Sequence, residues 1–211
     1  HIASAPNWDP DANVFKLLVA DLAAAPTSYT IRESKDGLHW SRLGKPNINF
    51  YCMVYDATDP DRTRRFKAFL PNRGFAVSAD ALTWTMLDVP PISSNDEYNF
   101  SFDQKTHMFI ATVKVRGPHG RSHAITTSKD FANWTKPELT FHADDEDQKV
   151  GRKAIEARLA DPTYLPVSAG NPKRYIVDVY NMGVGRYESL YVGFPAMFHR
   201  TGKDGFHLIQ L

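Results

Sequence analysis

The chain lacks most of the features that mark a specialised class of protein. Its 211 residues include a single cysteine, Cys52, which excludes an internal disulfide and a cysteine-based zinc site. Lys and Arg number 25 against 24 Asp and Glu, so the net charge is only +1. The positive residues are scattered, so we expect no nucleic acid partner and no membrane partner. Lys16 and Asp21 interrupt the longest apolar run, which leaves no membrane-spanning helix.

Metal-binding patterns are also missing. The eight His residues form no H-E-x-x-H motif and no closely spaced ligand set, so we expect neither a metal nor a cofactor. The acidic cluster 144–147 lacks the spacing of a known calcium loop, and the start of a solvated helix explains it better. Cys52 lies in the apolar run 50–54, which predicts a buried and inert thiol.

One short pattern, S-x-D-x-x-x-W, occurs three times, at Ser34–Trp40, Ser78–Trp84 and Ser128–Trp134. An aromatic-Asp pair precedes each copy, and the Asp residues of successive pairs, Asp9, Asp56 and Asp103, are 47 residues apart. A repeat of about this length is typical of a β-propeller blade.

The repeated residues have a structural explanation. Ser and Asp side chains accept hydrogen bonds from the backbone N–H groups of a tight turn between strands. Gly37, in the first copy, suits a backbone with positive φ. The Trp that follows buries a large apolar area against the neighbouring blade. We therefore expect these motifs to hold blades together and to take no part in catalysis.

The repeats predict one all-β domain over residues 1–211. We expect a β-propeller of four-stranded antiparallel blades, about four of which are present, as in an incomplete five-bladed ring. The units span about 1–44, 45–90, 91–141 and 175–211, with a helical insertion at about 142–174. Within the insertion, residues 144–160 predict a surface helix capped by Asp144 or Asp145.

The two ends of the chain carry further expectations. The chain begins at His1, without an initiator methionine or a visible signal sequence. This predicts either the removal of a leader, which favours a secreted or periplasmic location, or a fragment. The last unit has no S-x-D-x-x-x-W copy, which favours a fragment and, if the ring is incomplete, a homo-oligomer.

The candidate chemistry lies in a second repeat, D-x-Y-N, at Asp96–Asn99 and Asp178–Asn181. The first strand of each propeller blade lines the central channel, so residues that open these strands converge on one axial pocket. The other interpretation is that these side chains only satisfy backbone groups at strand ends.

Glycoside hydrolysis requires two carboxyl groups, one kept protonated and one ionised. We expect Asp96 or Glu97 to be one carboxyl of the pair and Asp178 or Glu188 the other, with either role open to each. The expected substrate-binding residues are Tyr98 and Tyr180 as stacking platforms, with Asn99, Asn181 and Arg121. Arg121, His119 and His123 surround the Gly117–Gly120 turn, which is either a substrate-contacting loop or a solvated hairpin tip.

The blade-like units, the S-x-D-G-x-x-W turn and the D-E-Y-N strand start together resemble the five-bladed β-propeller glycoside hydrolases. The nearest group is the bacterial proteins similar to the N-terminal domain of glycoside hydrolase family 32, related in architecture to families 43 and 68. The segments 180–194 and 204–211 look like the late-blade segments of that group. The resemblance implies a carbohydrate substrate or ligand and hydrolysis of a glycosidic bond.

The family acid set is incomplete in this chain. Family enzymes place acids on the inner strands of the first three blades, but Asn49 occupies the position equivalent to Asp96 in the second unit, and Asp9 falls at a strand end. This favours the alternative of a non-catalytic carbohydrate-binding or scaffold propeller. A sialidase is a third interpretation, because the turn motif is similar to the sialidase Asp box, although it is one residue shorter.

Overall fold

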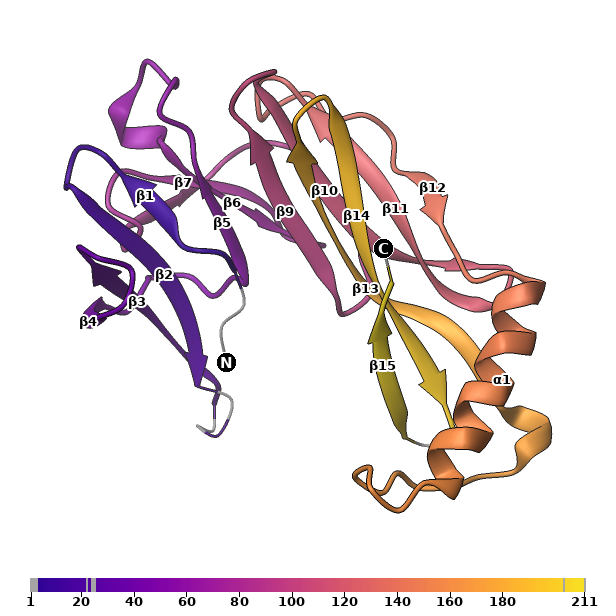
Figure 1. Ribbon diagram of the computed structural model, residues 1–211. Coiled ribbons are helices and arrows are strands. Elements are labelled where there is room, and N and C mark those ends of the chain that lie inside the picture. Colours follow the sequence, from indigo (N-terminus) through magenta and orange to yellow (C-terminus); the bar gives the residue numbers. More distant parts are fainter. Residues whose placement is uncertain (1–3, 22, 24–25, 203, 211) are drawn as a thin grey trace. The chain divides into compact units, whose positions relative to one another are not determined.

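The computed structural model describes residues 4–21, 23, 26–202 and 204–210. Within these residues the chain forms four antiparallel sheets and one α-helix (Figure 1). The first sheet contains β1 (Asn7–Asp9), β2 (Val14–Asp21), β3 (Ser28–Ser34) and β4 (Ser41–Gly44). The second contains β5 (Cys52–Tyr55), β6 (Phe66–Leu70), β7 (Gly74–Ser78) and β8 (Trp84–Met86). The third contains β9 (Tyr98–Asp103), β10 (Met108–Gly117), β11 (Gly120–Ser128) and β12 (Glu138–Phe141). The fourth contains β13 (Ile176–Tyr187), β14 (Leu190–Arg200) and β15 (Gly205–Ile209).

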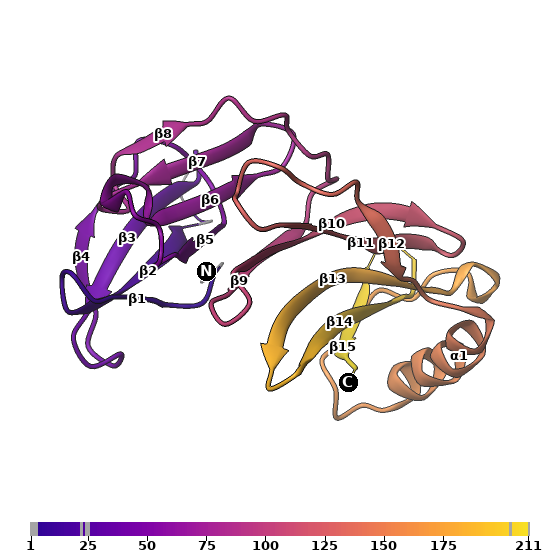
Figure 2. The same ribbon diagram turned by 90° about the horizontal axis from the view of Figure 1, so that it is seen from above.

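Every sheet is a meander in which strands that follow each other in the chain are neighbours, as Figure 2 shows for β5 to β8. This is the blade architecture of a β-propeller, and it confirms the predicted all-β fold class. The number of blades is four rather than the five of the family that the sequence resembles. Within the described residues, the β13–β15 sheet has three strands where four were expected.

The four sheets belong to two compact units. The first unit contains the β1–β4 and β5–β8 sheets with Phe100–Phe109 and Ser128–Asn133. The second contains Ser94–Asn99, Ile110–Thr127 and the chain from Trp134 onward. The β9–β12 sheet therefore contributes residues to both units. The arrangement of all the sheets in one domain stays a prediction.

The three S-x-D-x-x-x-W copies form the same turn. In each, the Ser Oγ donates to the Asp Oδ1 at 3.0 Å. Each Asp Oδ1 accepts the N–H groups two and three residues later, at 2.7 to 2.9 Å. The residue after the Asp has a left-handed φ in every copy, at 75° for Gly37, 68° for Ala81 and 62° for Phe131. The turn is thus fixed by its side-chain bonds strongly enough to hold two non-glycine residues in a conformation that favours glycine.

Replacing Ser78 with Ala is expected to lower the free energy of unfolding by about 1 to 2 kcal/mol. The Ser78 Oγ, which is buried, accepts from the N–H groups of Asp80 and Ala81, and both lose their acceptor. Chemical denaturation measures the change. Lys129→Ala, at the exposed second position of the third copy, is the control and should leave stability unchanged. Equal midpoints for both variants would show that the Ser bonds do not stabilise the turn.

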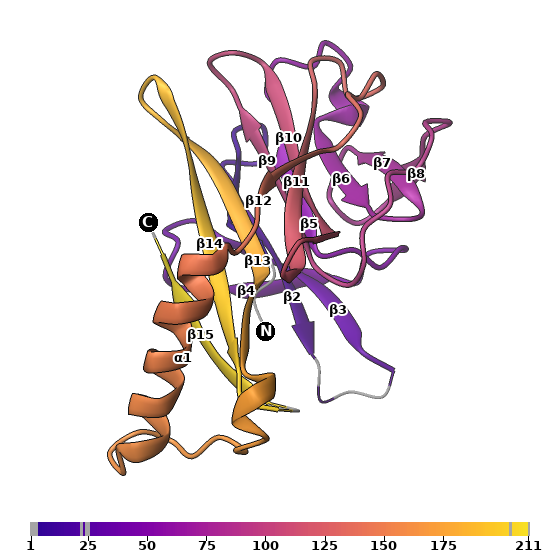
Figure 3. The same cartoon turned by 90° about the vertical axis from the view of Figure 1, so that its right-hand side faces the viewer.

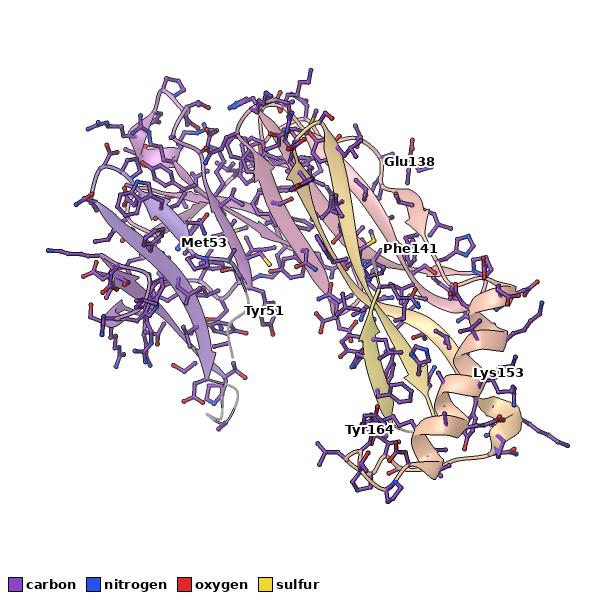
Figure 4. All side chains as sticks on the ribbon, viewed as in Figure 1. Tyr51, Met53, Glu138, Phe141, Lys153 and Tyr164 are labelled. Carbon is purple, nitrogen blue, oxygen red and sulfur yellow. The ribbon has the colours of Figure 1, made fainter. Side chains whose placement is uncertain are left out.

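The three Trp side chains that end the motifs are buried to different extents. Trp84 opens β8 and is 4% exposed, whereas Trp40 and Trp134 are half-buried. Trp40 and Trp84 each donate their indole N–H to the carbonyl three residues earlier, at 3.1 and 2.8 Å. Trp84 packs in the core of the first unit with Met53, which Figure 4 labels, and with Phe50, whose ring centroid lies 4.7 Å away. Cys52 is buried, as predicted.

The insertion forms the predicted helix, α1 (Asp145–Ala160). The Asp144 side chain accepts from Glu146 and Asp147, and Asp147 bonds back to the Asp144 N–H, which completes a capping box. Figures 1 and 3 show α1 running beside the β13–β15 sheet. Ile155 is fully buried, and Gln148 exchanges two hydrogen bonds with the backbone of Val177. The acidic cluster is therefore explained by helix capping.

Candidate active site in the second unit

The two D-x-Y-N segments meet in the second unit. The first leads into β9, and the second begins at the third residue of β13. Asn99 donates to Oδ1 of Asn181 at 2.6 Å, so the last residues of the two segments bind each other. Asn181 in turn donates to Oε2 of Glu97 at 3.3 Å. A single chain of side-chain hydrogen bonds thus links the start of β9 to β13.

A β-bulge in β13 places Asp178 and Asn181 on the same face of the sheet. Asp178 pairs with Phe198 and Asn181 with Ala196, so Tyr180 is an extra residue without a place in the ladder. Phe198 and Ala196 are two residues apart, and side chains two apart in a strand share a face. Asp178 and Asn181 therefore share that face, about 7 Å apart along the strand. Because Asn181 binds Glu97, the Glu97 carboxyl group is directed toward the face that carries Asp178.

The environments of Asp96 and Glu97 push their pKa values in opposite directions. Burial raises the pKa of the Glu97 carboxyl; Lys114 opposes this shift and the negative charge of Asp96 adds to it. Burial would also raise the pKa of Asp96, but the hydrogen bond and charge of Lys114 hold it below its ordinary value. The Lys114 Nζ lies 2.6 Å from Asp96 Oδ1. Neighbouring carboxyl groups whose pKa values diverge in this way are typical of acid and base assignments in an active site.

Asp178 is a buried carboxylate beside two guanidinium groups. Its Oδ2 lies 2.9 Å from Nε of Arg121 and 3.8 Å from Nη1 of Arg200. Asp178 is 1% exposed, and among the described residues its Oδ1 has no hydrogen-bond partner. Asp178, Arg121 and Arg200 all line a pocket of about 570 Å³, which the β10–β11 hairpin forms with β13 and β14. This oxygen is thus a buried acceptor, in a residue that lines the pocket, that no described group satisfies.

The hairpin tip around Gly117–Gly120 lines this pocket and is not simply solvated. Arg121 binds Asp178, while His119 lies 3.2 Å from Asp145 of α1. His123 is fully buried, and burial lowers its pKa to about 4, so it is neutral at neutral pH. Of these three residues, Arg121 and His119 are the ones that line the pocket.

The two Tyr side chains expected as stacking platforms lie in different surroundings. Tyr98 is 8% exposed, which leaves little of its ring for a sugar. The half-buried Tyr180 ring has the Lys114 Nζ 4.3 Å and the Arg121 guanidinium 5.1 Å from its centroid. These cation contacts compete with sugar stacking and tie Lys114 and Arg121 to the same ring.

Glu188 is not brought to the other carboxyl groups. It lies in the exposed turn between β13 and β14, with φ 52°. Ten residues of extended strand separate it from Asp178, a span of about 33 Å. Asp96, Glu97 and Asp178 stay the candidate acids, and Glu188 lies apart from them. Of the three, Asp178 lines the described pocket, and Asp96 and Glu97 do not.

Lys114 is a residue of the candidate site that was not expected from the sequence. Lys16, Lys67 and Lys114 are all buried, and each lies on the second strand of its sheet with its Nζ over an aromatic ring. Lys16 and Lys67 bind acids of the turn regions at the ends of β1 and β5. Lys114 instead binds Asp96 of the D-x-Y-N segment. The available signal was a Lys within an apolar run, here Val113-Lys-Val115.

Across the described residues, no group of three or more His, Cys, Asp or Glu side chains could hold a metal ion. No helix in that part of the chain is long and apolar enough to cross a membrane.

No protein-family model matches this chain, and no curated protein matches its sequence. Several solved structures are similar to it. A GH32 beta-fructofuranosidase from Bombyx mori, solved as a mutant in complex with sucrose, is 14% identical over 98% of this chain and 50% of its own, with a TM-score of 0.47. A beta-fructofuranosidase from Schwanniomyces occidentalis, complexed with fructosyl-erythritol, is 16% identical over 98% of this chain and 46% of its own, with a TM-score of 0.48. A further glycoside hydrolase is 14% identical over 93% of this chain and 66% of its own, with a TM-score of 0.46.

This chain spans about half the length of the two fructofuranosidases. Its structural neighbours thus include glycoside hydrolases, the group that the sequence resembles. The likeness concerns the course of the strands, and the chemistry of this chain depends on its own side chains.

Proposed function

We propose that this chain hydrolyses a glycosidic bond, with Glu97 as the proton donor and Asp178 as the ionised carboxylate. The observation that carries the proposal is the hydrogen bond from Asn181 to Glu97, which directs a carboxyl group of raised pKa toward the face of β13 that holds Asp178. Two carboxyl groups in these states are what the reaction requires.

Each neighbour has a role in this proposal. Lys114 binds Asp96, and the negative charge of Asp96 adds to the upward shift of the Glu97 pKa. Asn99 fixes the amide of Asn181, and Asn181 orients the Glu97 carboxyl. These are positioning residues.

Glu97 releases its proton to the leaving oxygen as the bond to the sugar breaks. Asp178 uses its free Oδ1 in one of two ways, either to take a proton from the attacking water or to bind the sugar directly. A carboxyl separation of roughly 6.5 to 9.5 Å favours the first and inversion of configuration, whereas roughly 5 to 5.5 Å favours the second and retention. The anomer that is formed first, followed by NMR, distinguishes them.

Asp178→Asn is expected to abolish hydrolysis while sparing sugar binding, because the substitution keeps the shape and removes the charge. The assay is hydrolysis of a panel of aryl glycosides and short oligosaccharides, with binding measured in parallel by calorimetry. Asp88→Asn, at an exposed position of the first unit, is the matched control and should keep full activity. Full activity in Asp178→Asn would remove Asp178 from the mechanism.

The second candidate function is non-catalytic carbohydrate binding. The observation that favours it is the burial of Asp178 between two arginines, which is also typical of a structural ion pair. Sugar binding by the wild-type chain, together with no hydrolysis of any substrate in the panel, would support this function over the first.

A further inference from the structure

The pocket beside Asp178 carries an excess of positive charge. Three of its lining residues are arginines, Arg116, Arg121 and Arg200, and the carboxylate of Asp178 is the one acid among the described lining residues. His119 also lines the pocket, and its partner Asp145 is not a lining residue. Three guanidinium groups against one carboxylate leave the pocket positive at neutral pH.

Two of the arginines lie beside Asp178 and have N–H donors to spare. Arg121 uses its Nε for Asp178, and its guanidinium lies 4.8 Å from the Phe198 ring and 5.1 Å from the Tyr180 ring. The described residues offer no acceptor to its two terminal nitrogens. Arg200 lies 3.8 Å from the same Asp178 oxygen, and 42% of its side chain is exposed. The guanidinium plane of Arg121 is therefore fixed before a ligand arrives, which reduces the entropy lost on binding.

Arg116 is exposed, and no ion pair or hydrogen bond of its side chain occurs in the part of the chain that the structure describes. An uncompensated guanidinium at the rim of a pocket attracts anions, and guanidinium groups bind carboxylate and sulfate through paired N–H donors. Asp178 is the acid of the pocket, and its Oδ2 already lies beside Arg121 and Arg200. The pocket thus offers N–H donors for an anion, with Arg116 uncompensated.

We propose that this pocket selects a sugar that carries an anionic substituent, either a carboxylate, as in a uronic acid, or a sulfate. The arginines bind the substituent through their N–H donors, and the sugar ring lies beside Asp178. This inference rests on the proposed function for the nature of the ligand, and it adds the class of sugar.

The experiment is binding of the intact chain to a glycan array that carries uronate, sulfated and neutral oligosaccharides. Calorimetry then compares a bound uronate with its methyl ester, which keeps the sugar and removes the charge. We expect the ester to bind at least tenfold more weakly, and binding of the acid to weaken as salt is raised. If a sulfated glycan binds instead, calorimetry compares it with its desulfated form. Whether uronate or sulfated glycans bind on the array identifies the substituent.

Arg116→Gln is expected to weaken binding of the acidic sugar about tenfold or more, since a charge-assisted contact is lost. Arg73→Gln removes the same charge from an exposed position of the first unit and should leave binding unchanged. Equal affinity for the acid and its ester, equal affinity of Arg116→Gln and wild type, or binding of neutral sugars alone would overturn the inference.

The outcomes separate this inference from the proposed function. Hydrolysis of neutral glycosides without a preference for acidic ones leaves the catalytic proposal intact and removes the inference. Tight binding of an acidic sugar without hydrolysis supports the inference and removes the catalytic proposal.

Discussion

Glu97→Gln is expected to slow hydrolysis of an oligosaccharide by about 100- to 10,000-fold, the usual contribution of general acid catalysis. Gln cannot donate an acidic proton to the leaving oxygen, but its side-chain oxygen can still accept the hydrogen bond from Asn181. The loss should be much smaller on a dinitrophenyl glycoside, whose leaving group departs without a proton. A purely structural role for Glu97 predicts the same fall in hydrolysis rate on both substrates. The ratio of the two rate losses therefore distinguishes the two roles.

The pH dependence of the wild type tests the same assignment. A proton donor works only while it is protonated, so activity should fall as pH rises through the raised pKa of Glu97. In Asp96→Asn a negative neighbour is lost and Lys114 has no counter-charge, and both changes lower the pKa of Glu97. The alkaline limb of the pH profile should therefore move to lower pH in this variant. A limb that does not move would contradict the electrostatic coupling between Asp96 and Glu97.

Trp84→Ala is expected to lower the free energy of unfolding by about 3 to 5 kcal/mol, the range for removing a large buried aromatic. The Trp84 ring lies in the core of the first unit against Phe50, and its indole N–H binds the Ala81 carbonyl at 2.8 Å. Asn47 also bonds to the backbone N–H and C=O of Trp84, so the cavity forms beside a fixed segment that cannot readily collapse.

Trp40→Ala is the matched control, because it is the same substitution at the same place in the motif but at a half-buried position. Its loss of stability should be clearly smaller. Urea denaturation, followed by the fluorescence of the remaining Trp residues, measures both. Equal effects of the two substitutions would mean that the motif Trp stabilises the turn alone and that burial of Trp84 in the core adds nothing.

The fold was predictable where short-range chemistry determines it. Ser, Asp and Trp at a fixed spacing specify one tight turn, and the 47-residue period then predicts the blades. Asp144 at the start of a polar segment determines the helix start by capping. The sequence was uninformative where the backbone departs from the pattern. Phe131 takes a left-handed φ of 62° that only neighbouring bonds can impose.

The candidate site was predictable in part. The D-x-Y-N repeat predicted that its two copies meet, and Asn99 and Asn181 do bind each other; the catalytic roles of Asp96, Glu97 and Asp178 stay predictions. Glu188 seemed close to Asp178 only because the length of β13 was unknown. The role of Lys114 depends on long-range contacts with Asp96 and Tyr180, and the bulge at Tyr180 depends on pairing with β14. Neither leaves a local pattern in the sequence.

A double-mutant cycle tests the central claim, that Glu97 and Asp178 act together on one glycosidic bond. The measurement is kcat/KM for the wild type, Glu97→Gln, Asp178→Asn and the double variant on one oligosaccharide. Groups that act as a unit are strongly non-additive, so the double variant should be little slower than the slower single variant. Losses that simply add, or a single variant with wild-type activity, would contradict the proposed pair.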